Sequence, residues 1–183
     1  GKLSFQQVPL VEIDGLNLVQ SVAAATYIAR TRGLYPEDPK DQFRADLVWQ
    51  SAQDARMPLL SWPWVQDKEA CATGFNFARY GTSWENMLAE QGTGFLVGTS
   101  LSMADVGVVE VLDFYRYILG PESLVELLQP TPLLAELVKS VEGHGRVREW
   151  MDERSKLFLS DADYAATVFF TLGKGPAPKP KPA

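Results

Sequence analysis

The pattern of apolar and polar residues near the N-terminus predicts a β-hairpin. Apolar residues recur with a period close to two in two short runs, Val8, Leu10, Val11 and Ile13, then Leu16, Leu18 and Val19. Between the runs stands Asp14-Gly15, a pair that favours a tight turn between antiparallel strands. Pro9 cannot donate a backbone hydrogen bond, so its run is expected at an edge, with the backbone of Val8 left to pair elsewhere.

Beyond the hairpin the apolar residues follow a helical period. Ser21 is expected to cap a helix that runs to about Arg32 and stops at Gly33. The prolines and charges of "LYPEDPKD" interrupt the pattern and suggest a linker at 34–41. Further helices are predicted at 42–60, where Pro58 should introduce a kink, and at 66–89, 101–119, 122–128, 132–142, 145–154 and 161–171.

The segment "LSMADVGVVEVLDFYRYIL" predicts the central helix of a bundle. Its apolar residues leave almost no polar face, as expected of a helix buried on all sides. Ser102 and Asp105 have the spacing of a capping box at its start. The Pro- and Lys-rich tail "GKGPAPKPKPA" lacks the apolar residues for a packed element and predicts an extended or disordered segment.

Composition narrows the possible functions. The chain has 183 residues, 46% of them hydrophobic, and 17 basic against 23 acidic residues give a formal net charge of −6. This charge disfavours nucleic acid as a partner. Cys71 and His144 are the only residues of their types, so we expect no internal disulfide, no metal site and a reducing compartment such as the cytoplasm. No segment is long and apolar enough to predict membrane insertion.

Read in order, "FQQVPLVEIDGLNLVQS", "YIARTRGLY" and "FLVGTSLSMADV" resemble the cytosolic glutathione transferases, most nearly the alpha, pi and sigma group. The similarity extends over about residues 3–172. It implies an α+β fold with part of a thioredoxin-like glutathione-binding domain at 1–33, a linker at 34–41, an all-helical domain at 42–172 and a tail at 173–183. It also implies a homodimer, or a subunit of a larger protein assembly, with glutathione as substrate.

The resemblance assigns the glutathione site. Gln7 and Val8 lie beside Pro9, which is cis in the family, and the backbone there pairs with the cysteinyl part of glutathione. Gln20 and Ser21 match the pair that holds the γ-glutamyl end, which agrees with the preference of a helix N-terminus for a carboxylate. The residues alone favour an ordinary edge strand with a trans proline, and simple helix capping, over ligand binding.

Further residues are assigned to the dimer and to the second substrate. Asp54 matches an acid that reaches the glutathione ammonium of the partner subunit, and Arg79 lies near an arginine of the alpha-like members and is also assigned to glutathione binding. Both would also suit a solvated helix face. Phe5 matches an aromatic residue inserted between two helices of the partner, with local packing as the alternative. The electrophile pocket is expected between "RMPLLSWPW" and "DYAATVFF", with the apolar walls Met57, Trp62, Phe169 and Phe170.

The chain departs from the family at its front. The strand, helix and strand that carry the thiol-activating residue have no match in this sequence, and Tyr27, Tyr35, Tyr80 and Cys71 are better explained as packing residues. Conjugation needs the glutathione thiol held as a thiolate. Two interpretations therefore stand: a glutathione transferase that is inactive as this chain, or a non-catalytic glutathione-transferase-like scaffold.

Overall fold

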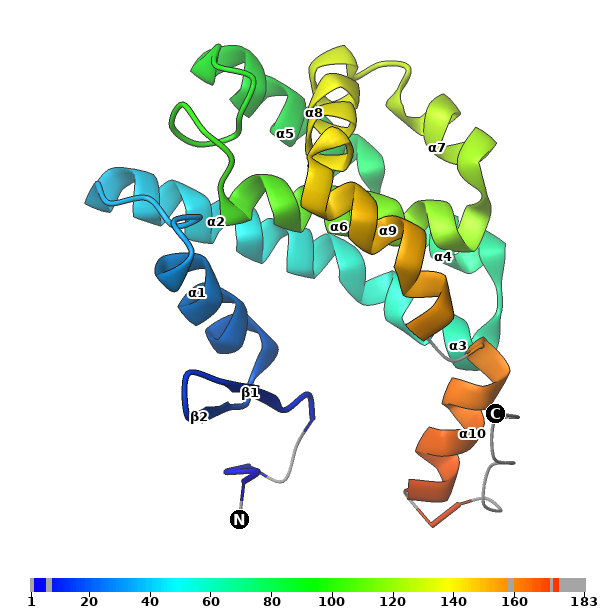
Figure 1. Cartoon of the computed structure of the whole chain (residues 1–183). Coiled ribbons are helices and arrows are strands. Elements are labelled where there is room, and N and C mark those ends of the chain that lie inside the picture. Colours follow the sequence, from blue (N-terminus) through cyan, green and yellow to red (C-terminus); the bar gives the residue numbers. More distant parts are fainter. Residues whose placement is uncertain (1, 6–7, 158–159, 172, 175–183) are drawn as a thin grey trace.

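The computed structural model describes residues 2–5, 8–157, 160–171 and 173–174. A two-stranded antiparallel hairpin and one helix lie outside a helical bundle, and a last helix projects below the bundle at its other end (Figure 1). The elements are β1 (Val11–Ile13), β2 (Leu16–Leu18), α1 (Ser21–Thr31), α2 (Pro39–Arg56), the 3₁₀ helix η1 (Met57–Ser61), α3 (Trp62–Val65), α4 (Lys68–Gly74), α5 (Phe77–Gln91), α6 (Met103–Leu119), α7 (Pro121–Leu128), α8 (Pro132–Gly143), α9 (Gly145–Leu157) and α10 (Asp161–Thr171).

The long helix predicted at 42–60 begins earlier and ends in a different form. Asp38 caps α2 by accepting from the amides of Lys40 and Asp41, and Pro39 takes the first helical position, where a missing N–H costs nothing. The α-helix ends at Arg56 and continues as η1 around Pro58. The α-helix is thus interrupted at Pro58, as its proline predicts, and the start of the helix lies within the segment that was expected to be a linker.

The single helix predicted at 66–89 is wrong. The chain breaks into α4 and α5 at Phe75 and Asn76, and Asn76 adopts the left-handed conformation with φ of 44°. Asn tolerates this conformation better than most residues. Gly74, just before the break, lies so close to η1 that an added Cβ would stand 2.8 Å from Cβ of Pro58.

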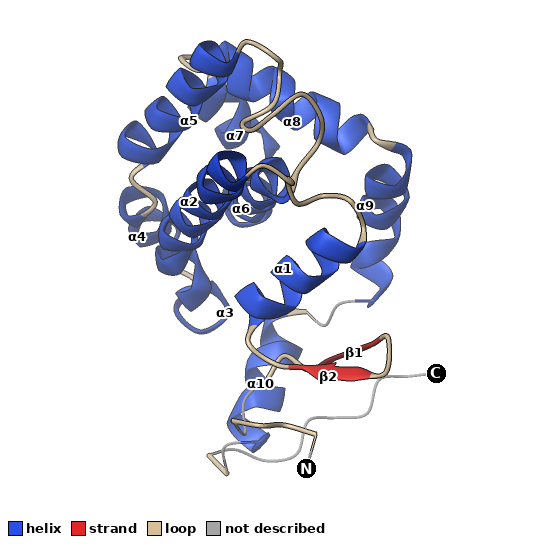
Figure 2. Cartoon of the chain, turned by 90° about the vertical axis from the view of Figure 1, so that its left-hand side faces the viewer, coloured by secondary structure: helices blue, strands red, loops and turns tan. Residues whose placement is uncertain are grey.

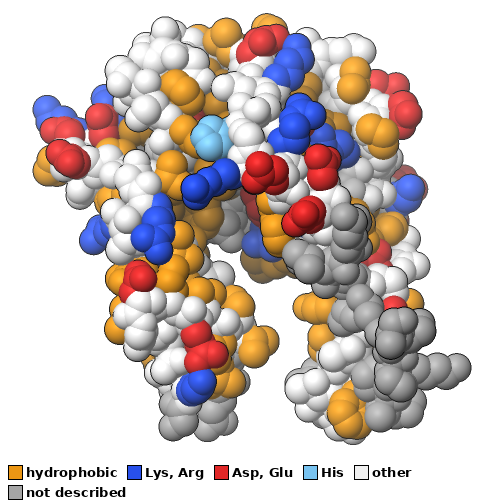
Figure 3. Space-filling model, in the orientation of Figure 1, with side chains coloured by type: hydrophobic (Ala, Val, Ile, Leu, Met, Phe, Trp, Pro, Cys, Tyr) orange, Lys and Arg blue, Asp and Glu red, His pale blue; other side chains and the backbone are white. Residues whose placement is uncertain are grey.

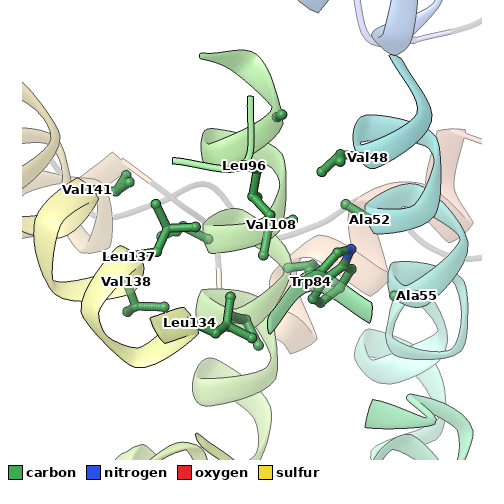
Figure 4. Packing of buried hydrophobic residues seen from close by; sticks show 14 of the residues in the cluster. Val48, Ala52, Ala55, Trp84, Leu96, Val108, Leu134, Leu137, Val138 and Val141 are labelled. Carbon is green, nitrogen blue, oxygen red and sulfur yellow. The ribbon is translucent and has the colours of Figure 1, made fainter. Parts of the chain in front are cut away.

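Helix α6 is the buried centre of the bundle, as its sequence predicts. It runs side by side with α2 (Figure 2). Gly107 permits this close approach, because a Cβ there would stand 2.6 Å from Cε3 of Trp49 on α2. Trp84 of α5 fills the adjoining core between α2 and α6 (Figure 4) and is fully buried, and its indole N–H donates to Ser51 Oγ at 2.9 Å.

The capping box at the start of α6 is confirmed. The buried carboxylate of Asp105 accepts from the Ser102 amide at 2.8 Å and from the Ser102 hydroxyl at 2.9 Å. Its other oxygen accepts from the amide of Leu96 at 2.8 Å, which fixes the preceding loop. Met103 then donates its amide to the carbonyl of Leu34 at 2.8 Å, so the linker after α1 is joined to the same point.

Helix α8 is capped from another helix. Its N-cap residue, Thr131, makes no side-chain capping bond. Glu85 of α5 supplies the acceptors instead, with one carboxylate oxygen 3.0 Å from the Leu133 amide and the other 2.8 Å from the Leu134 amide. A carboxylate at this end also interacts favourably with the helix dipole.

A cluster of charges joins α6, α8 and α9. Asp113 accepts hydrogen bonds from Arg116 and from Arg154, and Arg116 also pairs with Glu142 at 2.9 Å. Burial raises the pKa of the Asp113 carboxyl, but the hydrogen bonds from Arg154 and Arg116 outweigh burial and hold the pKa below its ordinary value. The cluster therefore favours the charged state of Asp113 in the folded protein.

Replacement of Asp105 tests the anchor of α6. Asp105→Ala leaves buried donors without an acceptor, and the free energy of unfolding in urea should fall by about 3 kcal/mol. Asp163→Ala is the matched control, because Asp163 also accepts from the hydroxyl of a serine three residues earlier, Ser160, but does so at the exposed start of α10. Its effect should stay below about 1 kcal/mol. Equal losses for the two variants would contradict the role given to burial.

The Asp113 cluster predicts a pH dependence. Because the folded-state pKa lies below the ordinary value, the cluster stabilises the fold above that value, and its contribution is lost as the pH falls through the folded-state pKa. Unfolding free energies measured from about pH 6 down to about pH 3 should therefore fall more steeply for the wild-type protein than for Asp113→Asn. Parallel curves for the two proteins would show that the cluster adds no acid sensitivity.

Candidate glutathione site

The hairpin presents the backbone before Pro9 to solvent. The Val8–Pro9 peptide bond is cis, as the resemblance implies, and the Val8 side chain is 80% exposed. In the register of the hairpin Ile13 pairs with Leu16, and Asp14 and Gly15 form the turn with positive φ, as predicted. Gln7 lies outside the described residues.

Contacts from the turn hold the hairpin against α1. The hydroxyl of Tyr27 donates to Asp14 Oδ2 at 3.2 Å, and the guanidinium of Arg32 lies 3.9 Å from Asp14 Oδ1. Tyr27 lies on α1 and Arg32 directly follows it, so the hairpin and the helix form one unit. The carboxylate at the turn thus helps to place β1, and the segment with Val8 that leads into it, relative to the start of α1.

The start of α1 differs from the sequence prediction. Ser21 is the first helical residue, Gln20 occupies the N-cap position with φ of 69°, and no side-chain capping hydrogen bond is made there. The expected capping role of the Ser21 hydroxyl is therefore wrong. Gln20 and Ser21 are both exposed, so the amides of the first turn and the Ser21 hydroxyl face the same solvent-accessible end of the helix.

Helix α1 is fixed to the bundle through Tyr35. The Tyr35 hydroxyl lies 3.0 and 2.9 Å from the two carboxylate oxygens of Asp46 on α2, and donates to this carboxylate. Arg30, in the last turn of α1, places its guanidinium 4.5 Å from the centre of the Tyr35 ring. The tip of α1 thus has a defined position relative to α2.

Asp54 and Arg79 lie on other helices and are both exposed. Asp54, near the end of α2, accepts from Gln50 at 3.2 Å, and the Arg79 guanidinium lies 5.1 Å from the centre of the neighbouring Tyr80 ring. These contacts lie within their own helices. Both side chains thus remain open to a second molecule, which is what a role across a dimer interface requires.

A pocket lies between α2 and α5. Its volume is about 270 Å³, and it is lined by Arg44, Leu47, Val48, Met87, Glu90, Gln91 and Leu96. Phe43 and Leu47 of α2 expose apolar surface on this side, and Phe5, ahead of the hairpin, is 63% exposed. The resemblance implies that Phe5 inserts between two helices of a partner, and this assignment stays a prediction.

The residues that could replace the thiol-activating residue of the family make contacts within this fold. Desolvation and the hydrogen bond to Asp14 raise the pKa of the Tyr27 hydroxyl. A group that stabilises the glutathione thiolate must instead donate a hydrogen bond to the sulfur. Tyr80 stacks on Trp84 with 5.9 Å between ring centres. Cys71 is buried, and desolvation raises the pKa of its thiol. These contacts agree with the packing roles expected from the sequence.

The two segments expected to flank the electrophile meet in the structure. Trp62 of α3 donates its indole N–H to Asp161 Oδ2 of α10 at 2.8 Å, and the rings of Trp64 and Tyr164 lie 5.7 Å apart. These contacts between α3 and α10 involve the first turns of α10. Phe169 and Phe170 lie farther along the helix, half exposed, and Met57 is 62% exposed at the start of η1.

Figure 3 shows a broad opening between the part of the chain that contains the hairpin and α1 and the part that contains α10. No helix of the described residues is both long and apolar enough to cross a membrane. Within the same described part of the chain, no group of three or more His, Cys, Asp or Glu side chains is placed to hold a metal ion.

Comparison with known proteins identifies the family. Residues 53–154 match the C-terminal domain of glutathione S-transferases. The chain is 35% identical over 174 residues to glutathione S-transferase 3 of Gallus gallus, covering 92% of this chain and 74% of the relative. It is 35% identical over 161 residues to glutathione S-transferase alpha-3 of Rattus norvegicus, covering 85% of this chain and 71% of the relative. The chain therefore belongs to the glutathione S-transferase family.

Solved structures agree on the fold. The glutathione S-transferase of Ascaris lumbricoides has a TM-score of 0.70 at 23% identity, covering 87% of this chain and 78% of that one. The prostaglandin synthase D of Nilaparvata lugens has a TM-score of 0.66 at 20% identity, covering 82% and 76% of the two chains. The predicted α+β class, with a partial thioredoxin-like domain and a helical domain, is confirmed.

Proposed function

We propose that this chain binds glutathione at the tip of α1 and pairs with a second copy of itself, as the glutathione-binding part of a transferase. The observation that carries the proposal is the exposed start of α1, where first-turn amides and the Ser21 hydroxyl lie together without a side-chain cap. Amides at a helix start favour a carboxylate. The γ-glutamyl carboxylate of glutathione is such a group.

The hairpin supplies the second half of the proposed site. The backbone of Val8 would pair with the cysteinyl residue of glutathione, and Gln7 and Pro9 flank that position in the sequence. Gln20 can accept from the glutathione ammonium and donate to its carboxylate. Asp54 and Arg79 of a second subunit would complete the charge balance, since both are exposed and contact only their own helices among the interactions described above.

The proposed dimer places Phe5 of one subunit in the pocket between α2 and α5 of the other. Leu47 and Met87 give this pocket apolar walls, and Arg44 and Glu90 stand among its polar lining residues. An aromatic side chain in such a pocket is a typical interface anchor. The same pairing would bring the partner's acidic Asp54 toward the glutathione site.

A non-catalytic role is the second candidate. Tyr27 and Tyr35 donate their hydroxyls to carboxylates of the fold, so neither is assigned to the glutathione sulfur. If this role is correct, the chain binds glutathione, but glutathione reacts with an activated aryl chloride no faster in the presence of the protein than in its absence. Conjugation well above the uncatalysed rate would contradict the proposal that the chain is inactive. It would not contradict the proposed glutathione site.

Glutathione binding tests the main proposal. The full chain should be retained on immobilised glutathione and eluted by free glutathione. Ser21→Ala should weaken the affinity, measured by titration calorimetry, by about tenfold, because a hydrogen bond to a charged group is lost. Ser83→Ala is the matched control, since the Ser83 hydroxyl bonds to the Arg79 carbonyl on α5 and should leave binding unchanged. Equal affinity for the three proteins would place the site elsewhere.

The proposed dimer predicts a mass of twice the 20.3 kDa of one chain in sedimentation. Leu47→Glu puts a charge into the pocket, and Phe5→Ser removes the proposed anchor, so both should shift the protein toward a monomer. Val125→Glu adds the same charge to another exposed apolar residue, on α7, and should leave the mass unchanged. A dimer in all three variants would contradict the Phe5 contact.

A further inference from the structure

The hairpin and α1 are joined to the helical bundle at one end of α1. Within the described residues, Ala29 is the one side chain of α1 in the main hydrophobic core, and Leu34 and Tyr35, just beyond the helix, pack against this core. The proposed glutathione-binding tip, at Ser21, lies at the opposite end of the helix (Figure 1). Because α1 has 11 residues, its two ends are about 16 Å apart. A rotation of about 10° at the joined end would therefore move the tip by about 3 Å.

Two side chains of α2 hold the segment that follows α1. The carboxylate of Asp46 accepts from the Tyr35 hydroxyl, with oxygen-to-oxygen distances of 3.0 and 2.9 Å. Gln42, four residues earlier and thus on the same face of α2, donates its side-chain amide to the carbonyl of Pro36 at 3.0 Å and to that of Glu37 at 3.3 Å. These bonds set the angle between α1 and α2.

The same segment is also bonded to α6. The carbonyl of Leu34 accepts from the Met103 amide at 2.8 Å, and the Leu34 amide donates to the carbonyl of Ala29 in the last turn of α1 at 2.8 Å. The segment after α1 thus contacts three helices within two residues. We call Leu34, Tyr35 and Asp46 the joint.

The joint and the proposed dimer pocket share one turn of α2. Leu47 and Val48, which directly follow Asp46, line the pocket between α2 and α5. The angle of the hairpin and α1 is therefore set from the same turn of α2 that a second subunit would contact.

We propose that Tyr35 and Asp46 are positioning residues, which orient the hairpin and α1 so that Asp54 of a second subunit reaches the glutathione ammonium. This inference rests on the proposed glutathione site and dimer. Val8 and Ser21 belong to the unit formed by the hairpin and α1, so their contacts with glutathione move with that unit. Asp54 lies on α2 of the other subunit, so its distance from glutathione depends on the angle at the joint.

The test measures the glutathione affinity of the full chain by titration calorimetry. Tyr35→Phe removes only the hydroxyl and should weaken binding by about fivefold, which is near the upper limit for an ion pair open to solvent. Asp46→Ala should weaken binding to a similar degree, whereas Asp46→Asn keeps an acceptor oxygen and should retain most of the affinity. Tyr117→Phe is the matched control, because its hydroxyl donates to the Asp161 carboxylate at 3.0 Å where α6 meets α10. It should leave the affinity unchanged.

A double-mutant cycle separates positioning from a general structural effect. Leu47→Glu should give a monomer, in which no second subunit supplies Asp54. Tyr35→Phe should therefore cause no further loss of glutathione affinity in the Leu47→Glu protein. An equal loss in the monomer and the dimer would overturn the inference, as would unchanged affinity in dimeric Tyr35→Phe.

Amide hydrogen exchange tests the joint independently of the ligand. If the wild-type chain fails to bind glutathione or to form a dimer, the proposed function fails, but the Met103 amide still reports on its bond to Leu34. Tyr35→Phe should speed exchange of this amide by about tenfold or more. The Val108 amide, in the middle of α6, should exchange as before, and Tyr117→Phe should change neither amide. Unchanged exchange of Met103 in Tyr35→Phe would contradict the positioning role whatever the ligand result.

Discussion

The fold depends on one buried carboxylate at the start of α6. Asp105 accepts hydrogen bonds from Ser102 and from the amide of Leu96, and it is fully buried. The next residue after the cap, Met103, bonds to the carbonyl of Leu34 in the linker that follows α1. The central helix, the loop before it and the segment that follows α1 are thus joined at one point, and a change there should affect all three.

Local chemistry made much of the fold predictable. The Asp14-Gly15 turn, the kink at Pro58 and the capping box at Ser102 each depend on residues close in sequence, and each is present in the structure. The break before α5 was missed because its signal is weak: Gly74 and Asn76 are tolerated in many helices, and the close approach to Pro58 that selects Gly74 is a tertiary contact. The cap that Glu85 provides for α8 spans 48 and 49 residues and has no local signature.

The candidate site was predictable to a similar degree. Its residues came from a resemblance whose motif lies mostly within "FQQVPLVEIDGLNLVQS", where the cis Pro9 is confirmed. The role of Ser21 was judged wrongly, because the positive φ of Gln20, which moves the helix start to Ser21, is not visible in the residue pattern. Asp161 was missed altogether, since its partners lie 99 and 44 residues away in the sequence.

The proposed glutathione site combines the backbone beside Pro9 with the exposed start of α1. The most direct test is to follow the backbone amides of an isotope-labelled chain by NMR while glutathione is added. Binding at the tip of α1 predicts that the largest shifts fall on Val8, Ser21 and Val22 and saturate together. Saturable shifts centred on other residues, with these three amides unmoved, would contradict it, as would the absence of any shift.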